Sequence, residues 1–124
     1  MFNQLILTFI GGGIGSIFRL LISAYTIQKS PSFPIGTLLA NVVSCLLLGL
    51  IIASYQKGLM NNSLKLFLAT GFCGGFSTFS TFSLENVQFL IDGRYNISFF
   101  YTLLSLILGF LFFFIGFKII SAFL

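Results

Sequence analysis

The stretch GFCGGFSTFSTFS, residues 71–83, decides the fold of this chain. It contains two adjacent glycines, Gly74 and Gly75, followed by five serines and threonines between residues 77 and 83. Long apolar segments lie on both sides of it. Glycine weakens a helix, and short hydroxyl side chains compete with the backbone for hydrogen bonds. The pattern therefore predicts a helix that is broken in the middle of an apolar span, where the freed backbone must be buried or line a cavity.

The composition places this stretch in a membrane. The chain has 124 residues, of which 57% are hydrophobic and only 6% are charged. Soluble domains carry about 25% charged residues, and a fold this small needs much polar surface in water. We therefore predict an all-α integral membrane protein that is multi-pass in the cell membrane, which is the inner membrane in a Gram-negative host.

Polar breaks divide the chain into four predicted spans. A membrane helix needs about 20 predominantly apolar residues. Such segments cover residues 4–25, 35–55, 64–91 and 97–123, all with approximate ends. The connections between them are short, so residues 1–124 are expected to form a single four-helix transmembrane domain whose third helix is broken.

The scarcity of titratable residues excludes most enzyme chemistry. The sequence has no histidine, and Glu85 and Asp92 are its only acidic residues, whereas general acid–base catalysis depends on such groups. The six lysines and arginines form no basic patch, and the glycine run at 11–15 lacks the context of a dinucleotide fingerprint. We expect no enzyme activity, no nucleic-acid partner and no nucleotide site.

The charges that flank the spans give little preference for either orientation. With four spans, Lys57, Lys65 and Lys118 lie on one side of the membrane, and Lys29 and Arg94 lie on the other. Orientation follows the lysine and arginine asymmetry of short loops, and three against two is a weak asymmetry. Two interpretations stay open: one extra lysine fixes a single orientation, or the chain inserts both ways and pairs as an antiparallel dimer.

The first span contains a cation at an unusual depth. Gly11, Gly15 and Arg19 are four residues apart, so they share one helix face. The glycines permit close packing against another helix. Arg19 either snorkels to the membrane interface or lines an aqueous vestibule that attracts anions.

Polar stripes also follow the second and fourth spans. Thr37, Asn41 and Ser44 share one face of the second span, and Tyr101 and Ser105 share one face of the fourth. Such groups either join helices by hydrogen bonds or face a permeating ion. The Asn41 amide can donate to an anion and accept from a neighbour.

Two phenylalanines and one acid complete the candidate residues. Phe79 and Phe82 share a helix face if the second half of the third span is helical. Aromatic ring edges carry partial positive charge, so the edges can contact an anion. Glu85, near the end of the same span, is either a gating or ion-pairing group or a solvated carboxylate.

Three motifs, taken in order, resemble the fluoride-specific ion channel family, also called Fluc or CrcB. They are GGGIG at 11–15 followed by Arg19, GTLLAN at 36–41, and GFCGGFSTFSTF at 71–82. The similarity extends over nearly the whole chain. It implies a dual-topology antiparallel homodimer in the lipid bilayer, with two fluoride pores per dimer.

The resemblance also implies roles for individual residues. Arg19 would lie near an aqueous vestibule. A sodium ion at the dimer centre would be held by the backbone carbonyls of Gly74 and Ser77 from both subunits. The pore-lining residues would be Asn41, Phe79, Ser80, Thr81, Phe82, Tyr101 and Ser105.

The function that the resemblance implies is passive, fluoride-selective export across the cell membrane, which relieves fluoride toxicity. The main alternative is a small multidrug-type proton-coupled antiporter, which relies on a carboxylate within the membrane. A non-transporting assembly subunit is a second alternative. The first span has no carboxylate and Glu85 lies near a span end, so the channel is the preferred interpretation.

Overall fold

The computed structural model describes residues 1–30 and 32–123, and in these residues helices alternate with short connections. The prediction of an all-α chain is confirmed for this part of the sequence. In chain order the elements are α1 (Phe2–Ile27), α2 (Ile35–Gln56), α3 (Asn62–Lys65), the π-helix η1 (Leu66–Cys73), α4 (Gly74–Phe76), α5 (Phe79–Ile91) and α6 (Tyr95–Phe123).

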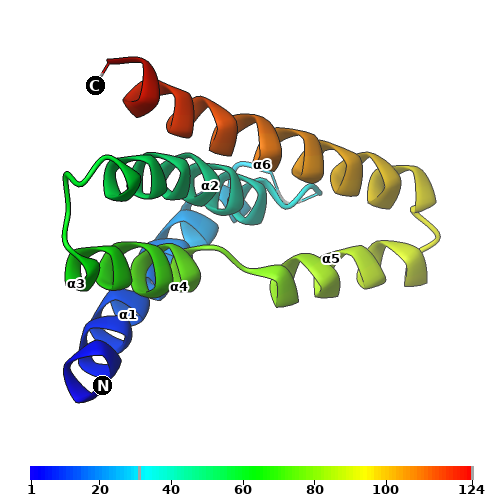
Figure 1. Cartoon of the computed structure of the whole chain (residues 1–124). Helices are drawn as coiled ribbons and strands as arrows, with labels where there is room; N and C mark the ends of the chain where they lie inside the picture. Colours follow the sequence, from blue (N-terminus) through cyan, green and yellow to red (C-terminus); the bar gives the residue numbers. More distant parts are fainter. Residues whose placement is uncertain (31, 124) are drawn as a thin grey trace.

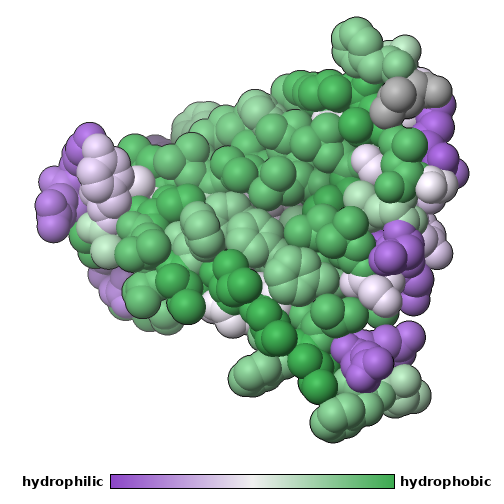
Figure 2. Space-filling model, turned by 90° about the vertical axis from the view of Figure 1, so that its left-hand side faces the viewer, coloured by the Kyte–Doolittle hydropathy of each residue, from purple (hydrophilic) through white to green (hydrophobic). Residues whose placement is uncertain are grey.

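The surface and the helix lengths are those of a membrane protein. Three of the described helices, α1, α2 and α6, are long and apolar enough to cross a bilayer. Large apolar side chains such as Phe9, Phe99 and Phe110 are exposed. Figure 2 shows a broad apolar surface with hydrophilic residues gathered toward two opposite sides. Lipid tails accept such a surface, so the chain is a multi-pass membrane protein.

The helices form two packed pairs (Figure 1). α2 packs along α6, and α1 crosses steeply and packs against η1 and α4. Between α4 and α5 the backbone is extended, with φ −77° and ψ 159° at Ser77 and φ −154° and ψ 118° at Thr78. The chain then becomes helical again as α5, which contacts α2 and α6.

Close helix contacts at glycine positions hold these pairs together. A Cβ atom at Gly15 would overlap the carbonyl oxygen of Phe72 in η1, and one at Gly49 would overlap that of Phe113 in α6. Gly11 and Gly15 are both buried, so the predicted packing face of α1 is confirmed. Backbones that approach this closely gain the van der Waals contact that drives helix association in lipid.

The end of α5 has a defined geometry. Gly93 has a φ of 71°, a left-handed conformation that suits glycine. The Gly93 amide donates to the Leu90 carbonyl at 3.1 Å, and the Arg94 amide donates to the Phe89 carbonyl at 2.7 Å. These two hydrogen bonds form a Schellman motif that terminates α5. It fixes the backbone of Arg94 beside the last turn of α5.

We expect Gly49→Ala to lower the free energy of unfolding, because its Cβ would overlap the Phe113 carbonyl oxygen. Overpacking of this kind costs about 1–3 kcal/mol, which denaturant titration of the detergent-solubilised protein measures. Gly13→Ala is the matched control, since no atom lies within 4 Å of a Cβ there and alanine suits a helix better than glycine. Equal stability of the two variants would contradict the packing argument.

Candidate functional site

The site is built around a hydrogen-bonded pair between Asn41 of α2 and the backbone of Thr78. The Thr78 amide donates to Asn41 Oδ1 at 2.7 Å, and Asn41 Nδ2 donates to the Thr78 carbonyl at 3.2 Å. Thr78 is only 7% exposed, and the extended backbone there has left the helix. Asn41 therefore replaces the partners that a continuous helix would supply. Its NH2 group carries two protons, and this pair uses one of them.

Hydroxyl groups gather at the N-terminus of α5. The Thr81 amide donates to Thr78 Oγ1 at 3.1 Å, so Thr78 caps the helix. The Thr78 hydroxyl also lies 3.3 Å from Ser80 Oγ and 3.1 Å from Thr81 Oγ1. A helix N-terminus carries partial positive charge. The break thus presents a short row of hydroxyls at the positive end of α5.

The break also releases two backbone carbonyls. In a continuous α-helix the Thr78 amide would bond to the Gly74 carbonyl, and the Thr81 amide would bond to the Ser77 carbonyl. These amides bond instead to the side chains of Asn41 and Thr78. Gly74 is exposed, and no atom lies within 4 Å of a Cβ there. The carbonyl oxygens of Gly74 and Ser77 are therefore left without these helical donors, next to an open surface.

The polar stripe predicted on α2 joins this helix to the segment that contains the break. Ser44 Oγ donates to the Cys73 carbonyl at 3.0 Å, and Thr37 Oγ1 donates to Glu85 Oε1 at 2.6 Å. With Asn41 bonded to Thr78, all three members of the stripe hydrogen-bond across helices. The stripe therefore joins α2 to that segment in the single chain.

Glu85 is bound from two helices. Besides the hydroxyl of Thr37 on α2, its carboxylate accepts a hydrogen bond from the Tyr101 hydroxyl of α6, at 2.6 Å on Oε2. Glu85 is half-buried, and Tyr101 is fully buried. Both oxygens of Glu85 thus accept hydrogen bonds from the protein, while the side chain is only half-buried.

Aromatic rings connect the break to this carboxylate. The Phe79 and Phe82 ring centroids are 5.9 Å apart, and those of Phe82 and Tyr101 are 5.1 Å apart. Phe79 is 80% exposed, at the surface of the single chain. Ser105 lies one turn further along α6, and its hydroxyl is buried with no hydrogen-bond partner among the described residues. The structure thus brings Phe79, Phe82 and Tyr101 together.

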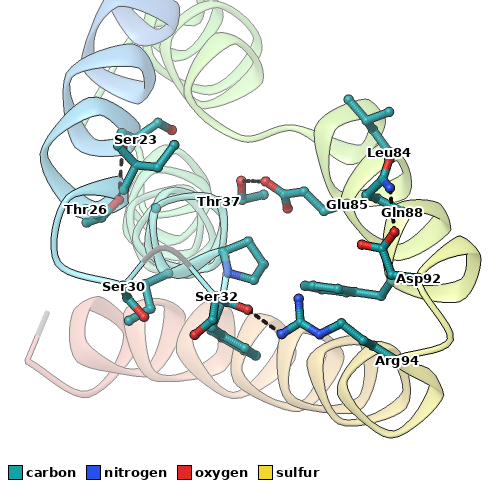
Figure 3. A pocket seen from close by; sticks show the side chains of 16 residues that line it. Ser23, Thr26, Ser30, Ser32, Thr37, Leu84, Glu85, Gln88, Asp92 and Arg94 are labelled. Atoms are coloured by element: carbon teal, nitrogen blue, oxygen red, sulfur yellow. Dashed lines mark hydrogen bonds between the residues drawn. The ribbon is translucent and has the colours of Figure 1, made fainter.

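A cavity of about 520 Å³ opens beside Glu85 (Figure 3). Its walls come from the end of α1, the connection between α1 and α2, and α5. Glu85 and Thr37 lie in it with their hydrogen bond, and Asp92 and Arg94 line it near the end of α5. Arg19 is half-buried on α1 and is not part of this lining. The structure therefore does not bring Arg19 into this cavity.

Four polar residues of the site were given no specific role by the sequence. Thr78 caps α5, as described above. Asn86 Oδ1 accepts hydrogen bonds from Ser98 Oγ at 2.8 Å and from Thr102 Oγ1 at 3.0 Å, which ties α5 to α6. The spacing of Ser98 and Thr102, four residues apart on one helix face, was the available signal. Their partner could not be identified without the fold.

The carbonyls released by the break are possible ligands for a cation. In the described residues, no three histidines, cysteines, aspartates or glutamates lie close enough to hold a metal. Unwound membrane helices use backbone carbonyls to coordinate sodium. The carbonyls of Gly74 and Ser77 fit that chemistry.

Known proteins are similar to this chain over the range of residues that contains this site. Residues 6–117 match the family described as CrcB-like protein, Camphor Resistance (CrcB). A protein named fluoride-specific ion channel FluC, from Gloeothece citriformis, is 42% identical over 119 residues, 95% of this chain and 97% of the relative. The FluC of Phocaeicola vulgatus is 43% identical over 111 residues, 88% of this chain and 91% of the relative. The match includes the break, the ring cluster and the cavity, and the chain therefore belongs to the CrcB family.

Proposed function

We propose that this protein is a fluoride-selective ion channel through which fluoride leaves the cell passively, relieving fluoride toxicity. The observation that carries the proposal is the uncharged track of Phe79, Phe82 and Tyr101 that begins beside the hydroxyls of α5. Relatives named fluoride-specific ion channels share this sequence over nearly its whole length. A protein of this family is a channel and not an enzyme.

The chemistry of the track suits a small, strongly hydrated anion. Water lost from fluoride is replaced by the hydroxyls of Ser80 and Thr81, by the second N–H of Asn41, and by the ring edges of Phe79 and Phe82. Conduction also requires that binding stay weak enough for the ion to leave. Neutral donors and ring edges satisfy both demands, whereas a full positive charge in the constriction would trap the anion.

Tyr101 and Ser105 continue the track along α6. The Ser105 hydroxyl is buried, and it neither donates nor accepts a hydrogen bond within the described residues. Burying a hydroxyl without a partner is unfavourable, so an ordinary packing role explains Ser105 poorly. A passing anion would accept the hydrogen bond that the protein does not use.

The pore requires a second copy of the chain. Phe79 is 80% exposed and Ser80 is exposed, so one chain supplies only part of a pore wall. An antiparallel homodimer brings two such walls together and repeats the pore by symmetry. The balance of three cations against two around the spans supports insertion in both orientations. Arg19 would then face a vestibule shared with the partner subunit.

The segment from α3 to α5 is the third span of this assembly. It covers residues 62–91, with its break at Ser77 and Thr78 near the middle of the membrane. Together with α1, α2 and α6 it makes a four-span domain of the whole chain. Freed carbonyls at the break of each copy would meet at the dimer centre, where Gly74 and Ser77 hold a structural sodium ion.

The antiporter alternative fits the site less well. Proton coupling needs a carboxylate that exchanges protons with both sides of the membrane during transport. Both oxygens of Glu85 accept hydrogen bonds from hydroxyls of the protein. Membership of the CrcB family also favours the channel.

Purified protein in liposomes loaded with fluoride is expected to release the ion without any opposing proton gradient, because the track holds no coupling group. Liposomes loaded with chloride should retain it, since chloride needs a wider path than a ring-lined constriction. Ion-selective electrodes measure both rates, and protein-free liposomes are the control. Equal release of the two anions would contradict the proposed selectivity.

We predict that Phe79→Ala and Phe82→Ala each lower fluoride flux by about tenfold, since a contact of about 1.4 kcal/mol is a factor of ten. Size-exclusion chromatography should show that the oligomeric state persists. Phe110→Ala is the matched control, because this ring is 76% exposed on α6 and belongs to no ring pair of the track. Unchanged flux in both track variants would argue against the ring-edge mechanism.

Removal of sodium is expected to abolish fluoride flux and to weaken the dimer, because the freed carbonyls lose their cation. Protein exchanged into N-methylglucamine salts, with sodium content measured by elemental analysis, tests this, and sodium addition should restore flux. Ser77→Ala should keep the sodium dependence, since the carbonyl and not the hydroxyl is the ligand. Full flux in sodium-free protein would refute the central ion.

A further inference from the structure

Arg94 fastens two parts of the molecule that are far apart in sequence. Its Nη2 donates to the Ser32 carbonyl in the connection between α1 and α2, at 2.8 Å. Its guanidinium also lies 4.8 Å from the centroid of the Phe89 ring on α5, within the range of a cation–π contact. Figure 3 shows the side chain crossing one side of the cavity toward Ser32. The Schellman bond from the Arg94 amide to the Phe89 carbonyl fixes its backbone.

Phe89, which Arg94 contacts, and Phe33, which follows Ser32, both pack against the Tyr101 ring. The Phe89 ring packs edge-on against Tyr101, with centroids 6.1 Å apart and planes at 90°. Phe33 follows Ser32 in the connection between α1 and α2. Its ring also packs edge-on against Tyr101, with centroids 5.4 Å apart and planes at 80°. The third ring around Tyr101 is Phe82 of the track. Among the described residues that surround Tyr101, Arg94 therefore contacts the Phe89 ring directly and bonds to Ser32, the residue before Phe33.

The position of Tyr101 matters because of the charge that it contacts. Its hydroxyl supplies one of the two hydrogen bonds that Glu85 receives, at 2.6 Å, and Thr37 supplies the other. Hydrogen bonds to a carboxylate stabilise and partly neutralise its charge. If Tyr101 shifts, the carboxylate keeps only the hydrogen bond from Thr37, and its less compensated negative charge beside the track repels an anion.

We propose that Arg94 is a positioning residue of the channel: by fastening Ser32 and Phe89, it holds Tyr101 against Glu85 so that fluoride can pass. The inference rests on the proposed function, since it takes Phe82 and Tyr101 as part of the ion path. Arg94 acts through these rings and does not itself touch the ion.

A simpler role for Arg94 is to attract anions by its charge alone. Lys29 provides the matched control for that role. It is exposed just after the end of α1, on the same predicted side of the membrane as Arg94. Its ammonium contacts Tyr25 in the last turns of α1. Lys29→Ala removes the same charge without disturbing the rings around Tyr101.

Single-channel recording in planar bilayers, with fluoride as the permeant anion, separates these roles. We expect Arg94→Ala to lower the unitary current by about tenfold, the effect of losing a hydrogen bond to a charged group. Lys29→Ala should leave the unitary current unchanged. A merely structural role for Arg94 would reduce the number of active channels but not the current through each. An unchanged unitary current in Arg94→Ala, or an equal fall in Lys29→Ala, would overturn the proposal.

A double-mutant cycle tests whether Arg94 acts on Tyr101 through the neighbouring aromatic rings. Phe33→Ala should also lower the unitary current, and Arg94→Ala combined with it should lower the current no further, because both changes release Tyr101. If Arg94→Ala yields no folded protein, Phe89→Leu removes the cation–π contact with an apolar side chain in place and should lower the current in the same way. Additive effects of the two substitutions on the unitary current would contradict the proposal that Arg94 acts through the rings around Tyr101. Absence of fluoride current in the wild-type protein would overturn the proposed function and this inference with it.

Discussion

The pairing of the Thr78 backbone with the Asn41 amide is the interaction on which the rest of the structure depends. Backbone N–H and C=O groups in the hydrocarbon of a membrane have no water to bond to, so each must find a partner in the protein or line a cavity. A helix pairs its own N–H and C=O groups, but the extended backbone at Ser77 and Thr78 does not form these helical hydrogen bonds. Asn41 supplies one acceptor and one donor at this point. α4 can end and α5 can begin here because α2 lies beside the break.

The main features of the site follow from that pairing. Because the Thr78 amide bonds to Asn41, the Gly74 carbonyl is freed, and because Thr78 caps α5, the Ser77 carbonyl is freed as well. The restart of the helix at Phe79 also sets where its side chains point, which brings Phe82 against Tyr101. A continuous helix through the same residues would use both of these carbonyls in its own hydrogen bonds.

Local patterns made the long helices predictable. Residues 35–55 and 97–123 were predicted as spans, and the structure has Ile35–Gln56 and Tyr95–Phe123 as helices, because apolar length and polar breaks act within a segment. The π-helical geometry of Leu66–Cys73 and the partners of Glu85 were not predictable. They depend on groups that meet only in the fold; Asn41 and Thr78, for example, are 37 residues apart. The residue types of the site could be named from the sequence, but their pairings could not.

The anion path proposed above would run beside an acidic residue, Glu85, and its negative charge would oppose the passage of an anion. A buried carboxylate without donors would repel fluoride and would itself be unfavourable. Thr37 and Tyr101 satisfy both oxygens of Glu85, and Tyr101 is fully buried among Phe33, Phe82 and Phe89. The hydroxyl can stay on the carboxylate only while these rings keep the phenol in place. On the proposed path, the charge of Glu85 would therefore be controlled by aromatic contacts that extend to Phe89, near the end of α5.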